Sequence, residues 1–369
     1  MIIGIDGNEA NVQERVGVSV YVLRLLEYFQ TNADESTQFV VFLRKAPGAT
    51  MPKEKKFFRY SVVPGVALWS QIFLPLQLYI KNEIDLFFSP AHYVPRYCPV
   101  PIVVTIHDLS FFYYPSEFRK KDLYQLKNWT AFSIKKSELI IAVSKTTKKD
   151  IVKWYDIDDK KISVIYNGFE KKAEKIEDGS ILKKFKLEAK KYILYVGTLQ
   201  PRKNIVTLIG AFDDYCKTHE DLKLVIVGKK GWLYDEIFEE VNKLNLKDKV
   251  IFTDFIPDDE VIVLYKNAWN FVMPSLYEGF GIPILEAMAY GCPVISSQKS
   301  SLPEIGGEAC LYFDPLGKTD LIEKWYQLAQ STDLYNKLVK VGKERVQTFS
   351  WEKCAKETLE LLKKSTSHD

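Results

Sequence analysis

Two glutamates flank a glycine-containing turn and could accept hydrogen bonds from the hydroxyl groups of a ligand. Glu278 lies just before Gly279 and Gly281, and Glu286 follows eight positions later in the segment NFVMPSLYEGFGIPILEAMAYGCPVISS. Carboxylates repel a phosphate group, but they bind hydroxyl groups well. The spacing therefore suggests a phosphorylated polyol as the ligand. Taken alone, however, the motif is better explained by a surface loop followed by an amphipathic helix that carries a solvated glutamate.

The elements around this turn follow from the hydrophobic pattern. Residues 271–273 predict a buried strand, Ile282 to Tyr290 predict a helix that ends at Gly291, and residues 293–296 predict a further strand. A strand, turn, helix and strand in this order form a βαβ unit. In an open α/β sheet, ligands bind at the carboxyl end of such a strand, where the first amides of the helix can hold an anion.

A pair of cations follows another predicted strand. The segment YILYVGTLQPRKN starts as a buried strand, reaches Gly197 and continues into a loop with Arg202 and Lys203. A guanidinium and an ammonium group together can neutralise a diphosphate. A basic helix start on the surface is the alternative, but cations are unfavourable at the positive end of a helix dipole, which favours a ligand-binding role.

His107 lies at the end of a third predicted strand, 101–106, and Asp108 follows it. A histidine at the carboxyl end of a strand is a candidate for contact with a substrate. The alternative is a structural histidine that hydrogen-bonds to Asp108 or to the backbone. The chain lacks metal-ligand spacing of His, Cys and Asp, the pattern GxxxxGK[ST] and a dinucleotide fingerprint, so hydride transfer and nucleoside triphosphate hydrolysis gain no support.

The composition describes an ordinary globular protein. The chain has 369 residues, a hydrophobic fraction of 47% and a formal net charge of +3. This length exceeds what one core usually supports, so we expect two domains, and the near-neutral charge argues against nucleic acid as the main partner. Five scattered cysteines and an N-terminus without the features of a secretory signal predict a reducing, cytoplasmic location.

Strands and helices alternate along the chain, which predicts a mainly parallel sheet in each domain. Residues 167–191 are rich in Lys, Glu and Gly, and they predict an exposed connector. From Leu321 to Lys364 the pattern predicts helix throughout, with Ser350 as a cap before Trp351. The strands predicted after the connector are 192–196, 224–227, 250–252, 271–273 and 294–296.

Several segments together resemble the family 4 retaining glycosyltransferases, which have the GT-B fold. PSLYEGFGIPILEAMAYGCPVI is similar to the E-x7-E signature of that family, and YVGTLQPRKN, TIHDL, AVSKTTKKDI, YNGF and FSWEK are similar to its other segments. The resemblance runs from about Ile3 to Leu362 and matches the branch that includes mannosyltransferases of bacterial surface polysaccharide synthesis. It implies an α/β chain of two Rossmann-like domains, 1–168 and 169–348, with a donor and acceptor cleft between them. A C-terminal helix, 349–369, would cross back to the first domain.

The resemblance also implies a role for each residue that matches a family motif. The donor diphosphate would be bound by Gly17, Arg202, Lys203 and the amide of Ile282. The transferred sugar would be held by Glu278 with the backbone of Phe280 and Gly281, and His107 would lie at the reacting face. Glu286 would bind the ribose, and the backbone near Ile256 would read the base.

Two positions depart from the family pattern. Thr198 stands where many relatives have Arg after the strand glycine, so Arg202 would reach the phosphates from another direction. Gly17 follows Val16, whereas many relatives have two glycines there.

The implied reaction is retaining and needs no metal ion or other cofactor. Negative charge develops on the leaving phosphate and positive charge on the sugar, and fixed cations and amides can stabilise the phosphate. We expect Glu278, the second catalytic candidate beside His107, to orient the sugar hydroxyls and stabilise positive charge without forming a covalent adduct. The donor would be a nucleoside-diphosphate sugar, with GDP-mannose favoured by the branch resemblance.

The acceptor is expected to be a saccharide or a lipid-linked saccharide. Basic and aromatic residues are interleaved at 53–58 and 119–129, and 66–80 is apolar, which suits a peripheral contact with an anionic membrane at the inner face of the plasma membrane. Solvated helix faces are the alternative. The uncharged segment 60–80 contains Pro64, Gly65 and Pro75, so we expect a strand end, a loop and a short helix instead of a membrane span.

Two other classes of protein stay open at this point. One is a sugar-nucleotide hydrolase or epimerase on the same fold. The other is a non-catalytic two-domain protein that binds a sugar.

Overall fold

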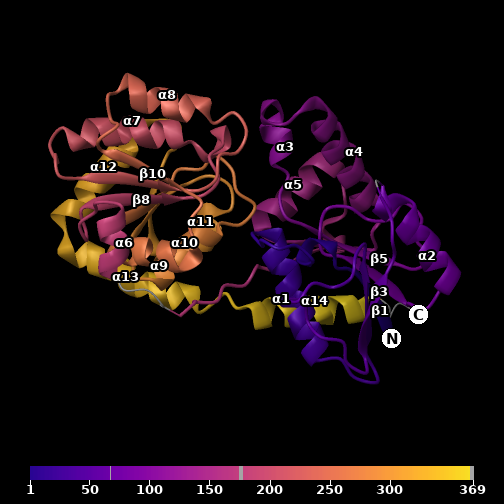
Figure 1. The fold of residues 1–369 in the computed structure, drawn as a ribbon. Helices are drawn as coiled ribbons and strands as arrows, with labels where there is room; N and C mark the ends of the chain where they lie inside the picture. The colour runs from indigo at the N-terminus through magenta and orange to yellow at the C-terminus, as the bar shows by residue number, and fades with distance from the viewer. Residues whose placement is uncertain (67, 174–177, 366–369) are drawn as a thin grey trace. The chain divides into compact units, whose positions relative to one another are not determined.

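The computed structural model describes residues 1–66, 68–173 and 178–365, and the chain divides into two compact units. Unit 1 comprises Met1–Gly168 with Phe349–Asp369, and unit 2 comprises Phe169–Thr348. Each unit is built around one parallel sheet with helices as crossover connections (Figure 1). Among the described residues, no helix combines the length and the apolar composition that crossing a bilayer requires.

The sheet of unit 1 has seven strands in the order β3-β2-β1-β4-β5-β6-β7. The strands are β1 (Ile2–Asp6), β2 (Gln38–Leu43), β3 (Phe58–Val62), β4 (Leu86–Ser89), β5 (Ile102–Ile106), β6 (Leu139–Ala142) and β7 (Ile162–Val164). Apolar side chains cover both faces of this sheet, because helices lie on both sides of it. The helices are α1 (Val18–Thr31), α2 (Phe73–Lys81), α3 (Ser110–Tyr113), α4 (Lys120–Lys136), α5 (Lys145–Tyr155) and α14 (Trp351–Lys364).

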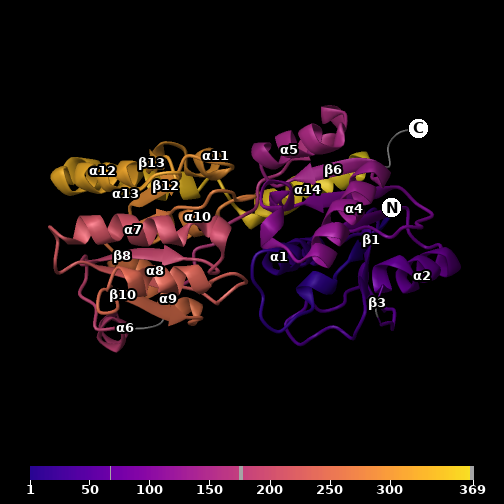
Figure 2. The ribbon, with the colours of Figure 1, turned by 90° about the horizontal axis from the view of Figure 1, so that it is seen from above.

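The segment 60–80 contains the end of β3, a loop, a short 3-10 helix at Trp69–Gln71 and α2. The predicted strand end, loop and short helix are therefore confirmed. α2 packs through Leu74 and Leu78 on one face of the sheet. It lies at the margin of unit 1 in two perpendicular views (Figures 1 and 2).

α14 packs on α1 within unit 1, although more than 300 residues separate the two helices in the chain (Figure 1). Ser350 accepts a hydrogen bond from the amide of Lys353 (3.1 Å), so the predicted helix cap is confirmed. The start of α14 passes very close to Gly168, where an added Cβ would lie 2.2 Å from the backbone nitrogen of Trp351. A side chain at position 168 would clash with this backbone, so glycine is needed there.

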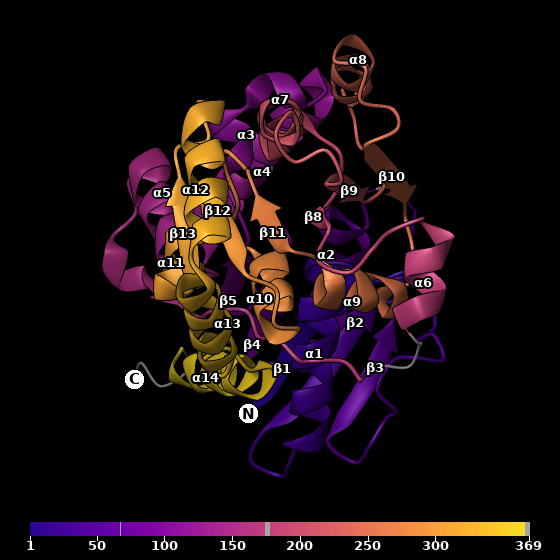
Figure 3. The ribbon, with the colours of Figure 1, turned by 90° about the vertical axis from the view of Figure 1, so that its left-hand side faces the viewer.

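The sheet of unit 2 has six strands in the order β10-β9-β8-β11-β12-β13. The strands are β8 (Tyr192–Val196), β9 (Lys223–Val227), β10 (Val250–Asp254), β11 (Asn270–Met273), β12 (Val294–Ser297) and β13 (Cys310–Phe313). Figure 3 shows α7 and α12 on one side of this sheet and α9 and α10 on the other. The helices are α6 (Asp178–Lys184), α7 (Ile205–Cys216), α8 (Asp235–Lys243), α9 (Asp258–Asn267), α10 (Ile282–Ala289), α11 (Leu302–Gly306), α12 (Lys318–Gln330) and α13 (Thr332–Val346).

The prediction of an exposed connector over 167–191 is confirmed for the exposure of most of the described side chains, but it is wrong in treating the whole segment as a connector. It contains α6, which packs against α9. Ile181 and Leu187 are buried, with 5% and 7% of their surfaces exposed, so a few apolar side chains among the charged ones are enough to fold the segment onto unit 2. Residues 174–177 lie outside the described part of the chain.

The prediction of continuous helix from 321 to 364 also needs correction. α12 ends at Gln330, and Ser331 caps α13 by accepting a hydrogen bond from the amide of Leu334 (3.1 Å). A second break precedes the cap at Ser350. The breaks divide the segment, so that α12 and α13 belong to unit 2 and α14 belongs to unit 1. β13 was not among the predicted strands.

Candidate active site

The turn that carries Glu278 joins β11 to α10 at the carboxyl edge of the sheet. β11 is buried along its whole length because it pairs with β8 and β12. Gly281 has a φ of 120°, a backbone conformation that favours glycine, and Pro283 lies in the first turn of α10, where its missing amide hydrogen costs little. These residues produce the sharp change from strand to helix that the sequence predicted.

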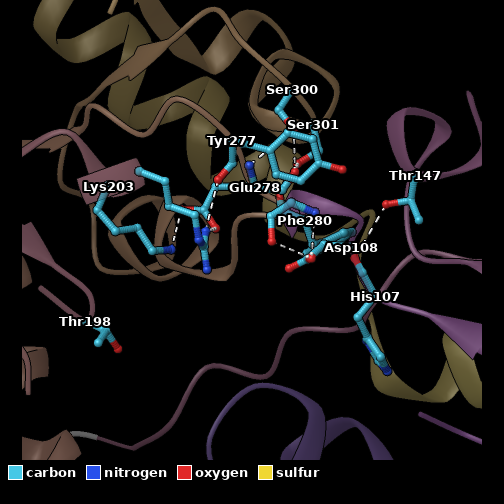
Figure 4. A network of polar contacts seen from close by, with 12 residues as sticks. His107, Asp108, Thr147, Thr198, Lys203, Tyr277, Glu278, Phe280, Ser300 and Ser301 are labelled. Atoms are coloured by element: carbon cyan, nitrogen blue, oxygen red, sulfur yellow. Dashed lines mark hydrogen bonds and ion pairs between the residues drawn. The ribbon is translucent and has the colours of Figure 1, made fainter. Parts of the chain in front are cut away.

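Two serines that follow β12 hold this turn in place. The Ser300 hydroxyl donates to the carbonyl of Glu278 (2.6 Å), and it accepts from the Glu278 amide (3.2 Å). The Ser301 hydroxyl lies 2.9 Å from the same carbonyl and 2.7 Å from the carbonyl of Phe280. Figure 4 shows both serines beside the turn. Sequence reasoning missed them because they lie more than twenty residues away from the turn in the chain.

Glu278 forms ion pairs with both predicted phosphate-binding cations. Its carboxylate lies 2.5 Å from Lys203 Nζ and 3.6 Å from Arg202 Nη1, and all three side chains are less than one-fifth exposed (Figure 4). Arg202 also donates to the carbonyl of Tyr277 (3.1 Å), and its own carbonyl accepts from the amide of Leu276 (2.8 Å). The short 3-10 helix Pro201–Lys203 after β8 is thereby attached to the turn after β11.

Charge in this cluster favours an ionised carboxylate. Burial would raise the pKa of Glu278, but the attraction of Lys203 and then of Arg202 is stronger, so its pKa is lower than usual. One carboxylate facing two cations leaves one net positive charge. The cluster can therefore attract an anion while Glu278 stays able to accept hydrogen bonds.

The predicted amide contact at the start of α10 depends on few groups. Pro283 has no amide hydrogen, and the amide of Ile284 donates to the carbonyl of Gly281 (3.1 Å). The predicted contact with a phosphate at this helix start thus depends on the amide of Ile282. The side chain of Ile282 is partly exposed.

Glu286 lies in α10 but has partners different from those of Glu278. Its carboxylate accepts a hydrogen bond from the hydroxyl of Tyr265 in α9 (2.9 Å). Burial raises its pKa, and this hydrogen bond opposes only part of the effect. A pocket within unit 2 is lined by Phe169, Glu170, Lys172, Asp258, Val261, Ile262, Tyr265, Glu286 and Tyr290.

This pocket combines three carboxylates and a lysine with aromatic side chains, which suits a polar ring such as a nucleoside. Ile256, predicted to read the base through its backbone, lies between β10 and α9, and its side chain is buried with 6% of its surface exposed. The sequence did not identify Tyr265. A signal was available, since a tyrosine in an otherwise apolar buried helix face needs a hydrogen-bond partner.

In unit 1, His107 follows β5 and is held by backbone groups. Its Nε2 lies 2.9 Å from the carbonyl of Pro90, and because a carbonyl only accepts, Nε2 carries the proton. The backbone amide of His107 donates to Nε2 of His92 (3.4 Å). Burial and then the neighbouring His92 lower the pKa of His107 to about 4, although Pro90 and Asp108 oppose this shift. His107 is therefore a neutral imidazole at pH 7.

Asp108 attracts the imidazole of His107 electrostatically, which acts to raise the pKa of His107. Its Oδ1 accepts from the amide (3.0 Å) and the hydroxyl (2.9 Å) of Ser110 at the start of α3. Of the two structural alternatives for His107, the hydrogen bond to the backbone is present. Gly17, the other candidate in unit 1, precedes α1 with a φ of 53°, and an added Cβ there would meet nothing within 4 Å.

Asp6 is a candidate that the sequence analysis missed. Asp6 is the last residue of β1, and His107 directly follows β5. Because β1, β4 and β5 are parallel neighbours in one sheet, both residues lie at the carboxyl edge of that sheet. Burial raises the pKa of Asp6 to about 6, although Asn8 donates to it from both its amide (3.1 Å) and its side chain (2.7 Å). An acidic residue at the carboxyl end of a strand, as in the segment IIGID, was the available signal.

In residues 1–66, 68–173 and 178–365, no group of three or more His, Cys, Asp or Glu residues could hold a metal ion.

The chain matches the sequence models of two families. Residues 16–172 match "Glycosyltransferase Family 4", and residues 179–345 match "Glycosyl transferases group 1". The O-antigen chain mannosyltransferase B of Escherichia coli is 30% identical over 283 residues, which cover 75% of this chain and 74% of that protein. The O-antigen chain mannosyltransferase RfbU of Salmonella typhimurium is 35% identical over 58% of this chain and 56% of its own length.

Solved structures share the fold at low sequence identity. A sucrose-phosphate synthase from Thermosynechococcus elongatus has a TM-score of 0.77 at 20% identity, and the match covers 100% of both chains. HepE of Anabaena, solved with UDP and glucose, has a TM-score of 0.74 at 17% identity over 98% of this chain and 99% of its own. The two parallel sheets, the arrangement of motifs and these matches agree: the chain belongs to glycosyltransferase family 4 and has the GT-B fold.

Proposed function

We propose that this glycosyltransferase moves mannose from GDP-mannose to a saccharide or lipid-linked saccharide during the synthesis of a cell-surface polysaccharide. The observation that carries the proposal is the cluster of Glu278, Lys203 and Arg202 beside the start of α10. The choice of mannose and of the polysaccharide is supported by the names of the O-antigen mannosyltransferases to which the chain is similar.

Donor binding would exchange partners within this cluster. The diphosphate carries more negative charge than one carboxylate, so it competes well for Lys203 and Arg202. Glu278 would then turn its lone pairs to the hydroxyl groups of the sugar. Its lowered pKa supports this role, because an ionised carboxylate accepts hydrogen bonds without donating.

The reaction is proposed to retain the anomeric configuration and to need no metal ion. Lys203, Arg202 and the Ile282 amide would stabilise the charge that develops on the leaving phosphate, and a departing phosphate oxygen would take the proton from the acceptor hydroxyl. Glu278 would stabilise positive charge on the sugar without forming a covalent bond. Gly17 would let its loop approach the phosphates.

His107 is proposed to contact the reacting sugar as a neutral group. With a pKa of about 4 it is not protonated at neutral pH, so a role as general acid is not part of the proposal. Glu286 with Tyr265 would hold the ribose, and the backbone near Ile256 would read the base. The site of action would be the cytoplasmic face of the plasma membrane, where lipid-linked acceptors are presented.

The test has a binding step and a transfer step, both with EDTA present. Isothermal titration with GDP, UDP, dTDP and ADP should single out GDP, and Lys203→Ala should abolish its binding. The exposed control Lys217→Ala, whose side chain is 63% exposed in the same unit, should leave the affinity unchanged.

In the transfer step, NMR of the product from GDP-mannose should show the α-anomer. A β-linked product, or activity that EDTA removes and Mg²⁺ restores, would overturn the mechanism. Release of free mannose without transfer to any acceptor in a saccharide and polyprenyl-linked panel would favour the hydrolase alternative instead.

A further inference from the structure

A segment at the boundary between the two units lines the pocket that contains Glu286 and Tyr265. Unit 2 begins at Phe169, and we call residues 169–172 the boundary segment. Its residues that line the pocket are Phe169, Glu170 and Lys172. Boundaries between compact units usually fall in exposed stretches with few contacts, so a boundary segment that forms the wall of a pocket suggests a ligand-binding role.

Tyr290 attaches the boundary segment to the end of α10. Its hydroxyl accepts a hydrogen bond from the amide of Lys172 (3.1 Å) and donates one to the carbonyl of the same residue (3.2 Å). The ammonium group of Lys171 lies 5.3 Å from the centre of the Tyr290 ring, which adds a cation–π contact. Tyr290 directly follows α10, the helix that carries Glu286. This one side chain therefore holds the boundary segment beside Glu286.

A second contact joins the boundary segment to α9. Lys172 forms an ion pair with Asp258, the first residue of α9, and both residues line the pocket. Their side chains are 56% and 65% exposed, and exposed ion pairs contribute little to stability. This contact can therefore open to admit a ligand while the backbone of Lys172 stays bonded to Tyr290.

The charges that line this pocket do not suit a phosphate group. Three carboxylates, those of Glu170, Asp258 and Glu286, accompany one lysine, Lys172. A diphosphate is better placed at the two cations that pair with Glu278. An uncharged ring with hydroxyl groups suits the pocket, because carboxylates accept hydrogen bonds from hydroxyl groups and aromatic side chains stack on flat rings.

We propose that the nucleoside of the donor binds between Glu286 and the boundary segment, with Tyr290 as the positioning residue that holds the segment in place. This inference rests on the proposed function, because it adds the boundary segment to the nucleoside site that the function requires. A ligand favours the conformation with which it makes contacts. Donor binding therefore fixes the backbone at the position where the chain enters unit 2.

The first test compares GDP with pyrophosphate, which has two phosphates but no nucleoside. Tyr290→Phe removes one hydroxyl and both of its bonds to Lys172, and it should weaken GDP binding in isothermal titration by about tenfold. The affinity for pyrophosphate should stay that of the wild type, because the diphosphate binds at other residues. An equal loss for both ligands would indicate general damage to unit 2 and would overturn the assignment.

Two further variants make the comparison specific. Tyr326→Phe removes a hydroxyl in α12 that lies 3.4 Å from the hydroxyl of Thr218, and it should leave both affinities unchanged. Lys172→Met removes the exposed ion pair and should change the affinity for GDP less than Tyr290→Phe does. The reverse order of these two effects would refute Tyr290 as the positioning residue.

Hydrogen exchange reports on the boundary segment itself. GDP should slow the exchange of the amides of residues 169–172 in the wild type, and pyrophosphate should not. Slowing by both ligands, or by neither, would overturn the nucleoside contact. In the transfer reaction, Tyr290→Phe should raise KM for the donor and leave kcat unchanged, because the nucleoside is remote from the reacting atoms. A fall in kcat at unchanged KM would contradict this role.

The choice of nucleotide separates this inference from the proposed function. If UDP, and not GDP, binds and slows exchange in the boundary segment, the proposed donor is wrong and the inference stands. If GDP-mannose is the donor but GDP leaves exchange in the segment unchanged, the inference is wrong and the proposed function stands. If no nucleotide binds, both are wrong.

Discussion

Replacing Lys203 with alanine should destabilise unit 2 through the carboxylate that is left behind. Glu278 would stay buried, with only 11% of its side chain exposed. Removing one partner of a buried ion pair costs about 3–5 kcal/mol. Arg202 remains at 3.6 Å from the carboxylate, against 2.5 Å for Lys203, and Coulomb attraction scales inversely with distance, so it keeps roughly two thirds as much attraction as Lys203 supplied. We therefore expect a loss at the lower end, about 3 kcal/mol.

The assay is thermal unfolding of the wild type, Lys203→Ala, Glu278→Ala and the double variant. For a unit of this size, about 3 kcal/mol corresponds to a fall of roughly 6–12 °C in Tm. The double-mutant cycle should give a coupling free energy of at least about 2 kcal/mol. The control is the pair Lys243 and Glu240 in α8, which has a similar separation of 2.9 Å but a lysine that is 70% exposed. Its coupling should be at most about 0.5 kcal/mol.

A coupling for the buried pair no larger than that of the control would refute the reasoning. The pH dependence provides an independent check. A pKa lower than the ordinary value of 4.5 means that Glu278 contributes stability above that pH, and that this contribution is lost as the pH falls through the folded-state pKa. Glu278→Gln should therefore flatten the decline of unfolding free energy on the acid side. An unchanged acid decline would show that Glu278 is not held ionised by its cations.

Three further changes probe other parts of the two units. Tyr265→Phe removes the hydrogen bond to Glu286 and should cost about 1 kcal/mol of stability and weaken GDP binding in isothermal titration; an unchanged affinity would argue against a ribose role. Because the pKa of His107 in the folded protein is lowered to about 4, the unfolded chain binds a proton at a higher pH than the folded protein does. The free energy of unfolding should therefore fall by up to about 3 kcal/mol as the pH drops from about 6.5 to 4. His107→Gln should remove most of this slope in urea titrations, and a slope equal to that of the wild type would contradict the assignment. Gly168→Ala would place a Cβ 2.2 Å from the Trp351 nitrogen and should cost about 3 kcal/mol or more; a thermal midpoint equal to that of the wild type would show that α14 can move aside.

Much of the local structure could be predicted because its causes are close in the sequence. The apolar run before Glu278, the glycine at 281 and the helical pattern from Ile282 predict strand, turn and helix, and all three are present. The cap at Ser350 follows from a hydroxyl placed just before a helical pattern, and it accepts the expected amide.

The errors occur where a segment is weakly patterned and its fold depends on a neighbour. The stretch that contains α6 looks like a charged linker, yet Ile181 and Leu187 are buried against the rest of unit 2. β13 is only four residues long and is stabilised by pairing with β12. This pairing leaves no pattern in the sequence of β13 itself.

The sequence by itself determined the fold class, the family and the residue types of the candidate site. Only the tertiary structure decided which of these residues touch. Lys203 and Glu278 are 75 positions apart, and their contact arises because β8 and β11 are neighbours in the sheet. Tyr265 and Ser300 entered the candidate site of unit 2 for the same reason: their hydrogen-bond partners are fixed by where strands and helices pack, and this depends on the burial of apolar surface over the whole unit.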